Sequence, residues 1–176
     1  MEKAAEKNIP VISVDSIVES EAVSVQIGVD NKKASEELGE YFVNYVKENL
    51  NGKVKLGIVG ALNSYIQNVR NDGFTEVIKK EPGIEILDIV DGKNVQEDAL
   101  TAAENLFTGN PNIEAVFATG EPALIGTAAA VESQNKKDQV KVFGWDLSKQ
   151  AIKGIDEGWV VAVVQQHPDK YGKESV

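Results

Sequence analysis

Four apolar, β-branched runs of this chain end in polar or aromatic side chains that have the chemistry to contact a small molecule. These runs are residues 54–65, 113–122, 140–146 and 159–168. The first three each precede a segment with helical spacing. In an open parallel α/β sheet, ligands bind in the crevice outside the carboxyl ends of the strands. We therefore expect a binding site whose wall is divided among four loop tips.

Two charged side chains near these tips are suited to binding hydroxyl groups. Arg70 stands near the start of the helical segment after the first run, where its planar fork of donors can face a crevice. Otherwise it would be a surface residue paired with Asp72 or Glu76. Asp146 ends the third run, and its carboxylate could accept hydrogen bonds from two adjacent hydroxyls. Otherwise it would cap a helix that begins near Ser148.

Uncharged groups at the tips add a second kind of contact. Trp145 could lay its apolar face against a sugar ring. Gly120 would let the backbone approach a ligand closely, although turn and capping chemistry before Pro122 also explains a glycine there. Gln165 and Gln166 end an apolar strand, so one amide should point into the crevice, where a ligand hydroxyl would be its partner.

Signatures of catalysis, cofactors and metals are missing from the sequence. It has no Gly-x-Ser-x-Gly elbow, no phosphate-binding loop and no dinucleotide glycine fingerprint. It has no cysteine, and the single histidine, His167, falls in a loop beside Pro168. The carboxylates are scattered over helix surfaces without an acid/base pair. We therefore expect no catalytic residue, no cofactor and no metal site.

The charge balance of the chain also narrows its partners. It has 176 residues, with 28 Asp and Glu against 18 Lys and Arg, and no basic cluster interleaved with aromatic residues. Because nucleic acids require a positive face, we expect no nucleic-acid partner. No stretch approaches the ~18 apolar residues of a membrane span, and the first residues lack the apolar core of a signal peptide.

Predicted strands and helices alternate along most of the chain. Strands are predicted at residues 54–59, 84–90, 115–118, 140–143 and 159–166. Helices are predicted at residues 31–47, 65–80, 95–107, 122–133 and 149–157. This alternation predicts an α/β fold, a three-layer αβα doubly wound parallel sheet. Residues 2–7 resemble the end of a helix and residues 167–176 the start of one, so we expect the chain to be a piece of a longer protein.

Six blocks, in this order, resemble the ribose- and galactose-type periplasmic binding proteins of sugar ABC transporters. They are NIPVISVD, VDN, RNDGF, NPNIEAVF, FGWD and QHPDKYG, at residues 8–15, 29–31, 70–74, 110–117, 143–146 and 166–172. The resemblance implies the type I fold, in which two α/β lobes are joined by three crossing strands and close on one sugar. It implies a membrane permease as partner and an extracytoplasmic location for the complete protein.

The same resemblance implies a division of the chain. Residues 1–22 would be a remnant of the amino-terminal lobe and a linker. Residues 23–166 would be the carboxyl-terminal lobe with two hinge crossings, and residues 167–176 the start of a truncated return segment. Strand edges and apolar residues that the missing lobe would cover could instead meet a second copy in a homodimer.

The resemblance further implies which residues contact the ligand, a monosaccharide or related polyol. Arg70, Asp146 and Gln166 match sugar-contacting positions of this lobe, and Asp15 matches a contact from the other lobe. Ribose-specific members commonly carry an arginine after the equivalent of Asp15, an Asn-Asp pair in place of Gly120-Glu121, and an aromatic residue near Asn94. With Ser16, Gly120 and Asn94 at these positions instead, we expect a ligand other than ribose itself.

These features favour a non-catalytic binding component of a sugar transporter. The alternative is the effector-binding domain of a sugar-responsive LacI-type transcription repressor, which shares the fold. That class requires a helix-turn-helix ahead of residue 1, and usually carries a Pro-x-Leu-Thr-Thr-Val-like run where this chain has residues 158–166. An enzyme on the same fold is the third hypothesis.

Overall fold

The computed structural model describes residues 1–175, which fall into two compact units. The larger unit comprises residues 31–165. The smaller comprises residues 1–30 together with the described residues from 166 onward. Each unit is described by itself.

The larger unit is built on a sheet of five parallel strands. In spatial order, they are β4 (Ile84–Asp91), β3 (Val54–Gly60), β5 (Ala115–Ala118), β6 (Lys141–Trp145) and β7 (Val160–Val164). From β3 the chain first adds β4 on one side of that strand, and then adds β5, β6 and β7 on its other side. The order in which strands are added therefore changes direction at β3. Parallel strands place their carboxyl ends along one edge, so the loops after β3, β5 and β6 all lie on the same side of the sheet.

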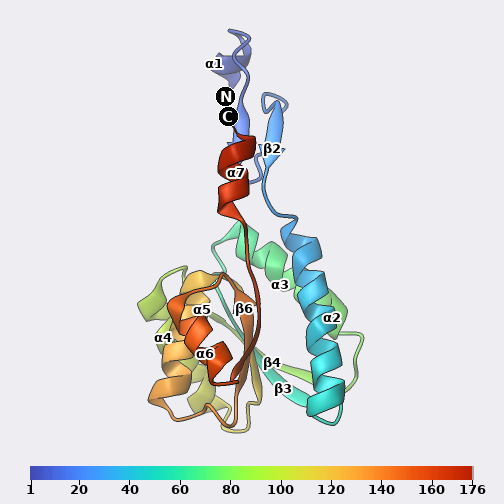
Figure 1. Ribbon diagram of the computed structural model, residues 1–176, viewed down its shortest axis with the longest axis vertical. Coiled ribbons are helices and arrows are strands. Elements are labelled where there is room, and N and C mark those ends of the chain that lie inside the picture. Colours follow the sequence, from blue (N-terminus) through green and yellow to red (C-terminus); the bar gives the residue numbers. More distant parts are fainter. Residues whose placement is uncertain (176) are drawn as a thin grey trace. The chain divides into compact units, whose positions relative to one another are not determined.

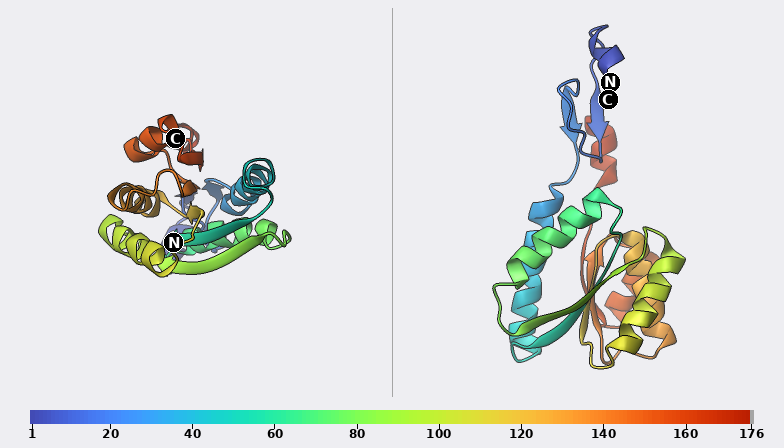
Figure 2. Two further views of the ribbon diagram at one scale, coloured as in Figure 1. Left: turned by 90° about the horizontal axis from the view of Figure 1, so that it is seen from below. Right: turned by 180° about the vertical axis from the view of Figure 1, so that it is seen from behind.

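Helices cover both faces of this sheet (Figure 1; Figure 2, right). One face carries α2 (Asn31–Asn49) and α3 (Tyr65–Ile78). The other face carries α4 (Gln96–Gly109), α5 (Glu121–Ser133) and α6 (Lys149–Asp156). The predicted three-layer αβα sheet is therefore confirmed. The observed bounds differ from the predicted ones by at most two residues at either end of an element, and β7 is shorter than the predicted strand 159–166.

The two-residue period of each strand divides the core between the two helical layers. On the side of α2 and α3, Phe117 stacks on Phe74 with ring centroids 4.0 Å apart, and Phe143 meets Phe42 edge-on at 4.8 Å. Neighbouring residues of β5 and β6, such as Val116, belong to the apolar cluster formed with α4 and α5. Strands buried on both faces explain why the sequence shows continuous apolar runs rather than alternation.

The smaller unit has little interior of its own. It contains α1 (Glu2–Ala5), the parallel strands β1 (Ile12–Val14) and β2 (Val25–Ile27), and α7 (Pro168–Glu174). No described residue of this unit is buried. Residues 23–30 group with this unit, and the predicted lobe of residues 23–166 with its two hinge crossings stays a prediction. Within the described residues, no helix combines the length and apolar character needed to cross a membrane.

Candidate functional site

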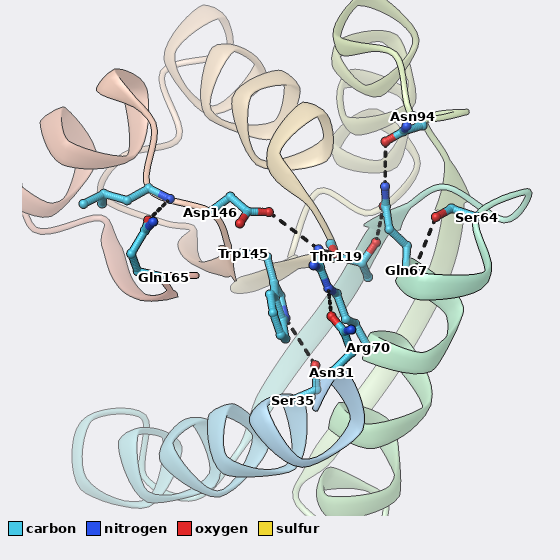
Figure 3. A network of polar contacts seen from close by, with 11 residues as sticks. Asn31, Ser35, Ser64, Gln67, Arg70, Asn94, Thr119, Trp145, Asp146 and Gln165 are labelled. Atoms are coloured by element: carbon cyan, nitrogen blue, oxygen red, sulfur yellow. Dashed lines mark hydrogen bonds and ion pairs between the residues drawn. The ribbon is translucent and has the colours of Figure 1, made fainter. Parts of the chain in front are cut away.

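Polar side chains from several loop tips meet at the carboxyl edge of the five-stranded sheet (Figure 3). Arg70 lies on the second turn of α3, Asp146 directly follows β6, and Thr119 directly follows β5. These segments are far apart in the sequence, and the parallel sheet brings them to the same edge. Three of the four loop tips that the sequence predicted therefore converge within the larger unit, whereas the fourth, residues 159–168, continues into the smaller unit.

Arg70 is the centre of this network. It is the only arginine in the sequence, and only 6% of it is exposed. Its Nε donates to Oδ1 of Asn31 at 2.9 Å, and its Nη1 donates to the carbonyl oxygen of Thr119 at 3.1 Å. The interpretation as a surface arginine is wrong, because these buried contacts hold the guanidinium inside the site. A planar fork of donors suits this position better than the point charge of a lysine.

Asp146 lies opposite the guanidinium and is the more exposed partner of the pair. Its Oδ2 is 3.6 Å from Nη1 of Arg70, with 23% of the Asp146 side chain exposed against 7% for Arg70. Its φ of 69° lies in the left-handed region, which aspartate tolerates better than most residues. The alternative role as a helix cap is wrong, because Ser148 caps α6 and accepts from the amide of Ala151.

The indole ring of Trp145 lies against the guanidinium of Arg70. The carbon at the centre of the guanidinium lies 3.8 Å from the centre of the indole ring, and the indole Nε1 donates to Oγ of Ser35 at 3.2 Å. The residue has no exposed surface. The expectation of an apolar face open to a sugar ring is therefore corrected: Arg70 covers the ring, and the stacked pair fixes the plane of the guanidinium.

A second group of side chains continues the wall from Thr119. The hydroxyl of Thr119 donates to Oε1 of Gln67 at 2.7 Å, and Nε2 of Gln67 donates to Oδ1 of Asn94 at 2.8 Å. Gly120 lies directly against the same Gln67 carboxamide. Asn94 and Gly120, both predicted from the sequence, are thus brought together by a residue that the sequence analysis missed.

The spacing between Gln67 and Arg70 could have identified Gln67 from the sequence. It precedes Arg70 by three residues on the same helix, and residues three apart share a helix face. A polar side chain at that spacing would point to the same edge of the sheet as Arg70. Only 6% of Gln67 is exposed, so its amide needs partners within the protein.

The remaining predicted residues are divided between the two units. Gln165 is exposed in the larger unit, and its Oε1 accepts from the backbone amide of Leu147 at 2.8 Å. Gln166 and Asp15 belong to the smaller unit, where Asp15 is exposed and its backbone amide donates to the carbonyl oxygen of Ile27. Ligand contacts by these residues remain predictions.

The chemistry of the network is that of binding. It offers a guanidinium, a carboxylate, carboxamides and a hydroxyl, which together can donate to and accept from the hydroxyls of a polyol. Among residues 1–175, no three histidines, cysteines, aspartates or glutamates gather into a group that could hold a metal ion. The ion pair of Arg70 with Asp146 joins an arginine, which stays protonated, to a carboxylate, and such a pair is suited to binding rather than to proton transfer.

Comparison with known proteins gives one family over the whole chain. Residues 1–176 match the family described as Periplasmic binding protein domain. The ribose import binding protein of Bacillus subtilis is 28% identical over 177 residues, which cover 98% of this chain and 54% of that protein. The chain therefore spans about half the length of this curated relative.

Solved structures give the same result. The XylFII molecule is 30% identical and superposes with a TM-score of 0.88, covering 99% of this chain and 63% of the other. GanP, a glucose-galactose binding protein from Geobacillus stearothermophilus, is 25% identical with a TM-score of 0.87, covering 99% of this chain and 61% of the other. These similarities extend over both units of the chain.

Proposed function

The chain belongs to the periplasmic binding protein family, and from this premise we propose that it is the carboxyl-terminal lobe of a two-lobed sugar-binding component of an ABC transporter. The chain covers 54% of the ribose import binding protein of Bacillus subtilis and 57% of the one of Escherichia coli, as one lobe with its connections would. The relatives found are binding proteins rather than enzymes, which agrees with the expectation of no catalysis.

One observation carries the proposal: the buried guanidinium of Arg70 is held beside the partly exposed carboxylate of Asp146 at the carboxyl edge of the sheet. Vicinal hydroxyls of a monosaccharide can accept from the guanidinium and donate to the carboxylate together. A monosaccharide or related polyol is therefore the ligand class. The names of relatives include ribose, glucose-galactose and allose binding proteins, which supports this class.

The mechanism that we propose is closure of two lobes on one ligand. A sugar that hydrogen-bonds to both lobes stabilises the closed state over the open one, by the difference in its affinity for the two states. Gln166 and Asp15 would add their side chains to the ligand in that closed state. The closed protein would then deliver the sugar to a membrane permease outside the cytoplasm.

A homodimer is the corresponding proposal for the chain by itself. Large apolar side chains are exposed on the smaller unit, at Ile9, Ile12, Val14, Ile17 and Val25. Exposed apolar residues next to unpaired strand edges favour association with another chain. A second copy would cover them when no amino-terminal lobe is present.

The proposed function is tested by Asp146→Asn in the two-lobed protein, with calorimetric titration of D-ribose, D-allose, D-glucose and D-galactose. The substitution keeps the shape of the side chain but replaces the charged carboxylate, whose two oxygens can accept hydrogen bonds from sugar hydroxyls, with a neutral carboxamide. A charged hydrogen bond contributes roughly 1.5–3 kcal/mol, so we expect affinity for the preferred sugar to fall about 10- to 100-fold. The melting temperature should change little, because the carboxylate is partly exposed.

Two results would count against the proposal. If the parent binds none of these sugars, sugar transport is the wrong function. If Asp146→Asn binds like the parent, the network at the sheet edge is the wrong site. The reading frame ahead of residue 1 distinguishes the alternative, because a LacI-type repressor would encode a helix-turn-helix there and a transport protein would encode another α/β lobe.

A further inference from the structure

Gly120 is a glycine for a reason other than its backbone conformation. It directly precedes α5, with φ of −168° and ψ of 172°, which is extended backbone that any residue adopts. A β-carbon on residue 120 would lie 2.9 Å from both Cδ and Nε2 of Gln67. The space that a side chain at position 120 would use is therefore occupied by the Gln67 carboxamide.

The carboxamide of Gln67 is held in one orientation by two hydrogen bonds. Its Oε1 accepts from the hydroxyl of Thr119 at 2.7 Å, and its Nε2 donates to Oδ1 of Asn94 at 2.8 Å. Because a carboxamide has two N–H donors and two acceptor lone pairs, one donor and one lone pair are left over. The backbone of Gln67 is also fixed, since its amide donates to Oγ of Ser64 at the start of α3.

Thr119 joins this carboxamide to the centre of the site. Its carbonyl oxygen accepts from Nη1 of Arg70 at 3.1 Å, while its hydroxyl donates to Gln67. Gln67 and Arg70 therefore lie on either side of a single residue, and the same face of α3 carries both (Figure 3). A ligand held by Arg70 and Asp146 would meet the carboxamide as the next polar group along the wall.

We propose that Gln67 is a specificity-determining residue, whose carboxamide takes the place of a side chain at position 120 and binds one ligand hydroxyl with its remaining N–H and lone pair. The inference rests on the proposed function, because it assigns the ligand class as a monosaccharide or polyol. It goes further by assigning the choice among such ligands to Gln67. A site that hydrogen-bonds one hydroxyl discriminates against sugars that place that hydroxyl differently.

A purely structural role for Gln67 has a different signature. If the carboxamide only connects α3 to Thr119 and Asn94, its loss would make the site less rigid and lower the affinity for every sugar by the same factor. If it binds a hydroxyl, its loss would change the order or the ratio of affinities among sugars. The ratio of affinities therefore separates the two roles.

The first experiment compares Gln67→Met with the parent in the two-lobed protein, by calorimetric titration of D-ribose, D-allose, D-glucose and D-galactose. Methionine has similar length but neither donates nor accepts strongly. We expect the best-bound sugar to lose about two- to tenfold in affinity, the effect of one neutral hydrogen bond. We expect the weaker sugars to lose less, so that the preference narrows. Gln96→Met, an exposed glutamine at the start of α4, is the matched control and should bind like the parent.

The second experiment tests the proximity of positions 67 and 120 with Gly120→Ala, Gln67→Ala and the double variant. A methyl group on residue 120 should displace the Gln67 carboxamide, so Gly120→Ala should change the sugar preference as Gln67→Ala does. Once the carboxamide is absent, the added methyl should have little further effect, and the two substitutions should be strongly non-additive.

The outcomes separate this inference from the proposed function. A parent that binds none of the four sugars overturns both. If the parent binds sugar and Gln67→Met leaves the affinities unchanged, or lowers them by the same factor for all four sugars, only the inference is overturned. Additive effects of Gln67→Ala and Gly120→Ala on the ratio of affinities also overturn it, because the two positions would then act independently.

Discussion

Arg70 illustrates how one residue can serve both the fold and the site. Every other basic residue in the sequence apart from His167 is a lysine. The single arginine occupies a position where it stacks on Trp145 and donates to Asn31 and Thr119. A guanidinium can make all these contacts at once because its donors lie in one plane. The protein therefore fixes the orientation of this group before any ligand arrives.

The first residue-scale prediction is that lysine will not replace Arg70. Arg70→Lys keeps the charge, but loses the stacking on Trp145 and at least one of the two hydrogen bonds to Asn31 and Thr119. Leaving a buried acceptor without its donor costs about 1–3 kcal/mol, so we expect a lower free energy of unfolding in urea. We also expect sugar binding by the two-lobed protein to fall more than tenfold. A variant that matched the parent in both measurements would contradict this role.

Sequence reasoning placed Arg70 and Asp146 at the carboxyl edge of the sheet, because a charged residue directly after a strand or early in the following helix is visible without a structure. It missed Gln67, because a glutamine inside a helix looks like an ordinary polar surface residue. It also assigned the wrong surroundings to Trp145, since burial under Arg70 depends on how α2 and α3 pack on the sheet. Contacts between residues distant in sequence, such as Trp145 with Ser35, carry no local signal.

At the scale of elements, the close packing of α2 on α3 positions the network. α2 carries Asn31 and Ser35, which hold Arg70 and Trp145, so the site depends on where this helix lies. Gly73 on α3 permits the close approach. A β-carbon on it would lie 2.5 Å from the carbonyl oxygen of Lys32.

We therefore predict that Gly73→Ala will destabilise the chain by about 1–3 kcal/mol, the usual cost of overpacking. The added methyl should push α2 away from α3 and lengthen the contact of Arg70 with Asn31. Chemical denaturation with circular dichroism measures the loss. Gly109→Ala is the matched control, because a β-carbon there would have no neighbour within 4 Å. Equal stability of the two variants would show that the helices do not need this approach.

A group of ion pairs ties α5 to α6 and the turn that follows it. Lys137 pairs with Glu132 of α5 and with Glu157, the residue after α6, and Lys153 also pairs with Glu132. The hydrogen bond from Lys153 holds the pKa of Glu132 below its usual value. Likewise, the hydrogen bond from Lys137 lowers the pKa of Glu157. Carboxyl groups with lowered pKa in the folded state stabilise it only while they are ionised.

This arrangement predicts the sign of a pH effect. The contribution of Glu132 is present above its unfolded pKa, near 4.5, and is lost as the pH falls through the lower folded pKa. Glu132→Gln should therefore have a lower melting temperature than the parent at pH 7, and the difference should disappear in strong acid. The effect should be small and weaken in high salt, because these side chains are partly exposed. A difference that persists unchanged at low pH would rule out this ion-pair origin.

The alternating pattern of strands and helices was enough to predict the three-layer sheet, because continuous apolar runs such as Val54–Gly60 are typical of parallel strands buried on both faces. The extent and pairing of the strand near residue 25 were harder to predict. Residues 23–29 alternate like a strand with one buried face, yet only Val25–Ile27 forms a strand, and it pairs with Ile12–Val14 in the smaller unit. Alternation alone does not identify the partner strand.

At the scale of the whole molecule, the buried apolar residues are confined to the larger unit. They run from Leu38 to Val160, and none lies in residues 1–30 or 166–175. The larger unit therefore supplies the cooperative core. The smaller unit contains no buried residue among those described, and several of its large apolar side chains are exposed.

At the same scale, we predict that this chain by itself will bind sugars weakly. The network of Arg70, Asp146 and Gln67 forms only one wall of the proposed site. The hydroxyls on the far side of a bound sugar ring would therefore stay in water, because no second lobe could close over the ring and exclude the solvent. We expect affinities in the millimolar range or weaker, several orders of magnitude below those of the two-lobed protein. Titration of the isotopically labelled chain by nuclear magnetic resonance, with D-ribose, D-allose, D-glucose and D-galactose, measures this directly. Submicromolar binding by the chain would mean that one wall is sufficient and that closure is not the source of affinity.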